Sequence, residues 1–125
     1  QREKQTEWLV QLIIENIKNF KVNILGKSFK AESNLTLGSP AILLQNLLKE
    51  KNVKANIWDP IVDQKFEEYS KKYSWDKEAQ LFFIATKHEE FNKFPFYSGS
   101  VVIDPWRYIS PRNDIKIIRV GDSKK

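Results

Sequence analysis

The segment from Val22 to Pro60 constrains the fold of this chain more than any other. It begins with a short, largely apolar run at residues 22–25 and ends with a second one at residues 55–58. Between them, Ser39 and Pro40 mark a helix start, since serine is a good N-cap and proline a good first helical residue. Leucines at helical spacing follow. Two strands joined through a helix form a βαβ unit, in which the strands run parallel.

The residues at the ends of these two strands indicate a ligand class. Gly26 follows the first strand and Asp59 follows the second, which is the layout of a nucleotide-binding half-fold. A dinucleotide fingerprint would need three glycines in the order G-x-G-x-x-G, and only Gly26 stands there. The segment therefore predicts a βαβ unit without a dinucleotide site.

Strands continue to alternate with helical segments along the rest of the chain. Residues 81–85 form the continuous apolar run expected of a central parallel strand, and residues 100–105 form a strand that ends in Asp-Pro. Residues 61–78 predict one helix and a loop, residues 86–91 open a short helix, and residues 115–121 predict an edge strand. This alternation predicts an α/β domain, Rossmann-like and three-layered, with a mostly parallel sheet.

A helix is predicted ahead of the first strand, at residues 6–20, because apolar residues recur there at helical spacing. Its apolar arc is about 200° wide, whereas one core-facing stripe needs only about 100°. Two interpretations stay open: the helix is buried deeply in its own domain, or it also contacts a preceding domain or a second subunit. We expect the chain to divide into this helix, residues 1–20, and a domain over residues 21–125.

Composition removes several classes of function. The 125 residues suffice for one domain, and 21 Lys and Arg against 16 Asp and Glu give a net charge of +5 that suits an anionic ligand. Acidic residues separate the basic ones, so we do not expect a nucleic-acid partner. No apolar run approaches the ~18 residues of a membrane span. With no cysteine and one histidine, neither a thiol nucleophile nor a metal site is expected.

The chain also contains no methionine, not even at position 1. We therefore expect it to be a piece of a longer protein.

Ligands of open α/β sheets bind at the carboxyl ends of the strands. Those ends are Gly26 to Lys30, Trp58 and Asp59, Thr86 to His88, and Asp104 to Arg107. We expect these four segments, distant in sequence, to converge in space.

Each polar residue at these ends also has an interpretation that needs no ligand. Asp59 and Asp104 each precede a proline, and the prediction we prefer is that both cap turns. Lys30 could be a solvated loop lysine, and Arg107 could form a surface ion pair worth about 0–1 kcal/mol. His88 is better explained as a helix-start residue than as a catalyst.

Five motifs, in this order and spacing, resemble a known family. They are residues 24–30, 39–40, 58–60, 86–91 and 102–104, and they resemble the C-terminal domain of the UDP-glucose/GDP-mannose dehydrogenases. In that family this domain binds the UDP part of the sugar nucleotide. The N-terminal helix looks like the end of the long helix that joins the family's middle and C-terminal domains and contributes to dimer contacts.

The resemblance implies roles for three residues. Phe29 and Lys30 match the Phe-Lys pair that contacts the sugar nucleotide, and Arg107 matches a basic residue that reaches the UDP. Positive charge at Lys30 and Arg107 suits a pyrophosphate, and Phe29 can wall the pocket or pack in the core. Other residues of the pocket would be Gly26, Asp59, Thr86 and Asp104.

The chain departs from the family before its Ser-Pro. Leu35 and Leu37 stand where the family usually has an acidic residue and then an arginine, and Gly38 stands at a commonly acidic position. That arginine resembles a cofactor contact in the family, so its loss argues against cofactor contact by this domain.

The resemblance implies an NAD-dependent enzyme that oxidises the primary alcohol of a UDP-sugar to a uronic acid through a covalent thiohemiacetal. That chemistry needs a cysteine, which this chain lacks. By the same resemblance, the full-length protein would be a cytoplasmic homodimer. It would have an N-terminal domain, which binds NAD, and a central domain, and both are missing from this chain. This chain would bind the UDP-sugar and be catalytically silent.

An alternative stays open: a degenerate Rossmann-like module that has lost its ligand and serves interaction or regulation. A receiver-like signalling domain is disfavoured, because no acidic cluster follows the first strand.

Overall fold

The computed structural model describes residues 2–17, 20–26, 40–60, 63, 65–86 and 88–119. In chain order the elements are α1 (Arg2–Ile17), β1 (Val22–Leu25), α2 (Pro40–Glu50), β2 (Ala55–Trp58), α3 (Phe66–Tyr73), β3 (Leu81–Ile84), α4 (Glu89–Asn92), β4 (Val101–Ile103) and β5 (Lys116–Ile118). The strands form one sheet in the order β2-β1-β3-β4-β5, and every neighbouring pair is parallel. The predicted α/β class with a parallel sheet is confirmed.

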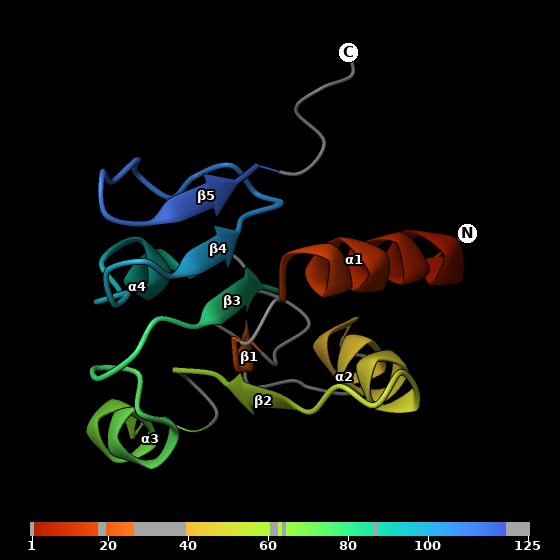
Figure 1. Ribbon diagram of the computed structural model, residues 1–125, viewed down its shortest axis with the longest axis horizontal. Helices are drawn as coiled ribbons and strands as arrows, with labels where there is room; N and C mark the ends of the chain where they lie inside the picture. The colour runs from red at the N-terminus through yellow and green to blue at the C-terminus, as the bar shows by residue number, and fades with distance from the viewer. Residues whose placement is uncertain are drawn as a thin grey trace.

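Helices cover both faces of this sheet (Figure 1). Helices α1 and α2 lie on one face and α3 and α4 on the other, which gives three layers. The strand residues alternate between two separate cores. Ile24 and Phe83 pack with α1 and α2, whereas Phe82 and Ile84 belong to an aromatic core on the side of α3 and α4. Because both faces are covered, β1, β3 and β4 are buried along their whole length.

The strand order contains a reversal of direction. From β1 the chain moves through α2 to β2 at one edge, then crosses back over β1 to β3, β4 and finally β5 at the other edge. The predicted edge position of the last strand is confirmed. The reversal makes the gap between the carboxyl ends of β1 and β3 a topological switch point, where doubly wound sheets bind their ligands.

Helix α4 begins three residues later than the sequence predicts, at Glu89 instead of Thr86. The reason is that the chain after β3 is still bonded to β1, since the backbone N–H of Ala85 donates to the Leu25 carbonyl at 2.8 Å. His88 then adopts an extended conformation as the N-cap of α4. Its predicted place at a helix start is confirmed.

Helix α1 starts earlier and ends earlier than predicted, at Arg2 and Ile17. Val10 and Ile13 are buried in the core that α1 shares with α2, whereas the Trp8 side chain is 55% exposed. The helix is thus part of this core and still presents an aromatic side chain to its surroundings. Among the described helices, none combines the length and the apolar content that a membrane crossing requires.

Candidate functional site

Gly26, directly after β1, lies against Thr86, which follows β3, at the switch point. Gly26 has φ +109°, and a Cβ built on it would lie 2.7 Å from the Cβ of Thr86 and 2.8 Å from its backbone nitrogen. Only a residue without a side chain permits this approach. The first turn of the βαβ unit therefore needs its glycine for loop packing, whatever the ligand.

Asp59 and His88 form a buried pair beside this contact. The His88 Nε2 atom lies 3.3 Å from Oδ2 of Asp59, and both side chains are fully buried. Phe91 packs edge-on against the imidazole ring. The backbone N–H of Asp59 also donates to the Asp63 carboxylate at 3.0 Å. The pair joins the end of β2 to the start of α4 across the carboxyl end of the sheet.

Asp104 organises the loop that follows β4. Its Oδ1 atom accepts hydrogen bonds from the backbone N–H groups of Trp106 and Arg107 at 3.0 and 2.9 Å. Its Oδ2 atom accepts from those of Tyr108 and Ile109, both at 2.8 Å. The prediction that Asp104 caps a turn is confirmed. One buried carboxylate thus fixes the loop in which Arg107 adopts the left-handed φ of 56°.

Two aromatic residues of this loop reach back across the sheet. The Tyr108 hydroxyl donates to the His88 carbonyl at 2.5 Å, and the Trp106 indole N–H donates to the Ile84 carbonyl at 3.2 Å. Burial, reinforced by the negative charge of Asp104, raises the pKa of Tyr108 well above its usual range, so the hydroxyl stays a neutral donor. The described residues of the four predicted strand ends therefore converge, whereas residues 27–30 and 87 lie outside the described part of the chain.

Trp106 and Tyr108 are the members of the site that sequence reasoning missed. The available signal was their place in the loop of Arg107, two and four residues after Asp104. A tryptophan just after a strand end was a usable hint, but nothing in the sequence says which way either ring points.

The structure brings Gly26, Asp59, Thr86 and Asp104 to one end of the sheet, with Arg107 exposed on the same rim. Phe29, Lys30, Leu35, Leu37 and Gly38 lie outside the described residues, so the roles expected for them stay predictions. Among the described residues, no group of three or more His, Asp or Glu side chains is placed to hold a metal ion.

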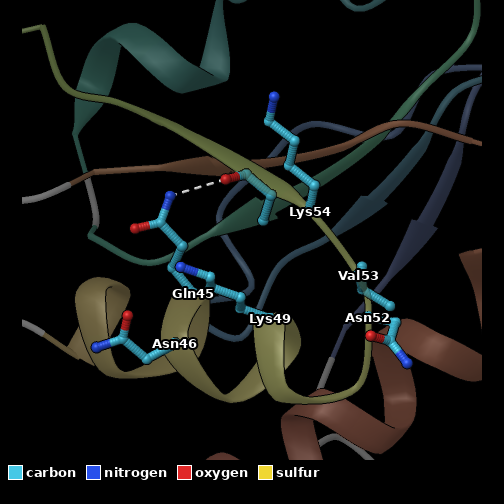
Figure 2. A pocket seen from close by; sticks show the side chains of 7 residues that line it. Gln45, Asn46, Lys49, Asn52, Val53 and Lys54 are labelled. Atoms are coloured by element: carbon cyan, nitrogen blue, oxygen red, sulfur yellow. Dashed lines mark hydrogen bonds between the residues drawn. The ribbon is translucent and has the colours of Figure 1, made fainter.

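Two hollows lie at opposite ends of the sheet. The larger, of about 620 Å³, lies between the second half of α2 and the start of β2, with Gln45, Lys49 and Lys54 on its wall (Figure 2). Gln45 is held there by a hydrogen bond of 2.8 Å to the Ala55 carbonyl. A smaller hollow of about 240 Å³ lies at the carboxyl ends of β3 and β4. We assign the candidate site to the carboxyl end in spite of the difference in volume, because open parallel sheets bind ligands there.

The family model described as the UDP-binding domain of the UDP-glucose/GDP-mannose dehydrogenase family matches residues 23–111. Those residues contain β1 except its first residue, Val22, then β2, β3 and β4, together with Gly26, Asp59, Thr86, His88 and the loop from Asp104 to Ile109. A comparison with curated proteins finds no match.

Several solved structures share the fold. A UDP-N-acetyl-mannosamine dehydrogenase from Staphylococcus aureus aligns over 96% of this chain and 31% of its own, with a TM-score of 0.74 and 22% identity. A UDP-glucose dehydrogenase from Pyrobaculum islandicum aligns over 94% and 29%, with a TM-score of 0.69 and 23% identity. A GDP-mannose dehydrogenase from Pseudomonas aeruginosa aligns over 92% and 31%, with a TM-score of 0.66 and 19% identity. The chain thus spans about a third of the length of these proteins.

Proposed function

The chain belongs to the UDP-glucose/GDP-mannose dehydrogenase family, and on this basis we propose that it binds the UDP part of a sugar nucleotide within an NAD-dependent UDP-sugar 6-dehydrogenase. The observation that carries the proposal is the match of the UDP-binding-domain model over residues 23–111. The convergence of the strand ends at the switch point supports it, because that is where doubly wound sheets bind nucleotides.

In this proposal the pyrophosphate is bound by Lys30 and Arg107. Arg107 is exposed on a loop that Asp104 fixes through four backbone hydrogen bonds. A guanidinium offers a planar fork of donors to phosphate oxygens, and lysine adds a point charge. Phe29, next to Lys30, packs on the ligand or walls its pocket.

The residues of this chain do not fit NAD. A dinucleotide loop needs three glycines, and only Gly26 follows β1. Oxidation of the sugar's primary alcohol to a uronic acid is accordingly assigned to parts of the protein outside this chain, which has no cysteine nucleophile. Binding energy at the UDP would position the sugar carbon there. The proposal also includes N-terminal NAD-binding and central domains, a dimer to which α1 contributes, and a cytoplasmic location.

One observation favours a second candidate function. Leu35 and Leu37 stand at positions that are usually charged in the family, which suits a degenerate module that has lost its ligand and serves interaction or regulation.

Isothermal titration of the chain with UDP, UDP-glucose and GDP distinguishes the two. UDP should bind, and Lys30→Ala and Arg107→Ala should each weaken it about 10-fold or more, the cost of a charged hydrogen bond. Lys54→Ala is the matched control, since Lys54 lies at the opposite end of the sheet. No heat from any nucleotide, with a sample that circular dichroism shows to be folded, would favour the degenerate module.

A further inference from the structure

Arg107 lies between two residues whose side chains reach across to the neighbouring strand. On one side of it, the Trp106 indole N–H donates to the Ile84 carbonyl at 3.2 Å. On the other side, the Tyr108 hydroxyl donates to the His88 carbonyl at 2.5 Å. The two acceptors stand at the end of β3 and at the N-cap of α4. The chain is therefore attached to the segment between β3 and α4 both immediately before and immediately after Arg107.

The backbone of Arg107 needs such support, because it is strained. Its φ of 56° is a conformation that residues other than glycine rarely adopt, and such conformations persist only where the surrounding structure imposes them. The Asp104 carboxylate accepts the four backbone N–H groups of residues 106–109. Those four bonds lie within one short segment and set its shape. The bonds of Trp106 and Tyr108 set its position against β3 and α4.

The acceptor of the Tyr108 hydroxyl is itself fixed. The His88 imidazole is paired with the Asp59 carboxylate at 3.3 Å, and both side chains are fully buried. Phe91 packs edge-on against the same ring. The connection therefore runs from the loop after β4, through the start of α4, to the end of β2.

We propose that Tyr108, together with Trp106, is a positioning residue that holds Arg107 in place for the pyrophosphate of a nucleoside diphosphate. The inference rests on the proposed function, in which Arg107 binds that group, and adds to it what keeps the arginine in position before the ligand arrives. Ordering a mobile segment costs binding free energy, and a segment that is already fixed avoids most of that cost.

A double-mutant cycle of Tyr108 and Arg107 tests the proposal. Tyr108→Phe removes the hydroxyl and keeps the ring, and it should weaken UDP binding about 2- to 12-fold in isothermal titration, the equivalent of one neutral hydrogen bond. In Arg107→Ala protein the same change should have no further effect, because the residue on which Tyr108 acts is gone. A loss of structure unrelated to Arg107 would weaken binding equally in both backgrounds.

Tyr97→Phe is the matched control. It removes the same hydroxyl from an exposed tyrosine that precedes β4 at the opposite, amino end of the strand. UDP binding should not change in this variant.

A second measurement needs no ligand. The backbone N–H order parameter of Arg107, from nuclear magnetic resonance relaxation, should be that of a rigid backbone in the wild type, about 0.85. It should fall in Tyr108→Phe and stay unchanged in Tyr97→Phe.

Three outcomes would overturn the proposal. If the wild type and Tyr108→Phe bind UDP equally well, or the order parameter of Arg107 does not fall, Tyr108 does not position Arg107, although the proposed function stands. If Tyr108→Phe weakens UDP binding as much in Arg107→Ala protein as in the wild type, its effect does not pass through Arg107. If folded wild-type protein binds no UDP, the inference and the proposed function fail together.

Discussion

Gly26 shows how one residue decides the geometry at the switch point. Its φ of +109° lies in a region that side chains disfavour, and the missing Cβ leaves the space that the Thr86 side chain and backbone occupy. The contact holds Gly26, at the end of β1, against Thr86, after β3, and so fixes the separation of the chain at these two points.

Gly26→Ala should lower the free energy of unfolding by about 1–3 kcal/mol, because it adds both backbone strain and a steric clash. Urea denaturation of the chain measures this. Gly99→Ala is the matched control: Gly99 has φ +93°, but its added Cβ would meet only the Cβ of Ala79, at 3.4 Å. Equal losses in the two variants would show that backbone strain alone matters and that the contact with Thr86 tolerates a methyl group.

At the scale of elements, a buried polar network joins three parts of the chain. The Asn23 side chain in β1 donates to Gln80 Oε1 at 2.7 Å and accepts from the Trp75 indole N–H at 2.9 Å. Gln80 in turn donates to the carbonyls of Tyr73 and Ser74, at the end of α3. The network ties the centre of the sheet to the segment between α3 and β3, and its members satisfy one another away from water.

Asn23→Leu should lower the free energy of unfolding by about 2–4 kcal/mol. It leaves the Trp75 N–H and the Gln80 amide oxygen without their partner in a buried place, at about 1–3 kcal/mol for each orphaned group. Thermal denaturation followed by circular dichroism measures it. Asn46→Leu, on the exposed side of α2, should change stability by less than about 0.5 kcal/mol. A near-neutral Asn23→Leu would mean that apolar packing replaces the network.

At the scale of the whole molecule, α1 packs into the core of the fold, even though the apolar arc around the helix is wider than one core contact needs. Ile13 is fully buried and Val10 nearly so, in the core shared with α2 and one face of the sheet. Trp8 faces away from that core and is exposed. One helix thus supplies both a core stripe and an aromatic surface.

Ile13→Ala should cost about 2–5 kcal/mol of unfolding free energy, because it removes buried methyl groups and leaves a cavity. Trp8→Ala should cost less than about 0.5 kcal/mol in the monomeric chain. Guanidinium denaturation of both variants at equal concentration gives the comparison. If Ile13→Ala were as mild as Trp8→Ala, α1 would be an appendage that docks only weakly on the domain.

The local patterns of the sequence determined the α/β class and the order of its elements. The predicted strands at residues 81–85 and 100–105 contain β3 (Leu81–Ile84) and β4 (Val101–Ile103), because uninterrupted apolar runs suit the strands of a sheet covered on both faces. The Ser-Pro pair predicted a helix start, and α2 begins at Pro40. The convergence of the strand ends also followed from the sequence, since it needs only the rule that parallel strands end at one edge.

Only the tertiary structure decided which side chains meet at that edge. The pairing of Asp59 with His88, the reach of Trp106 to Ile84 and that of Tyr108 to His88 join residues between 20 and 29 positions apart. Such contacts depend on strand order and on side-chain direction, and local periodicity carries neither. The sequence likewise could not show that Asn23, in an apolar strand, is a buried hydrogen-bonding centre, because its partners come from segments that only the folded sheet brings alongside.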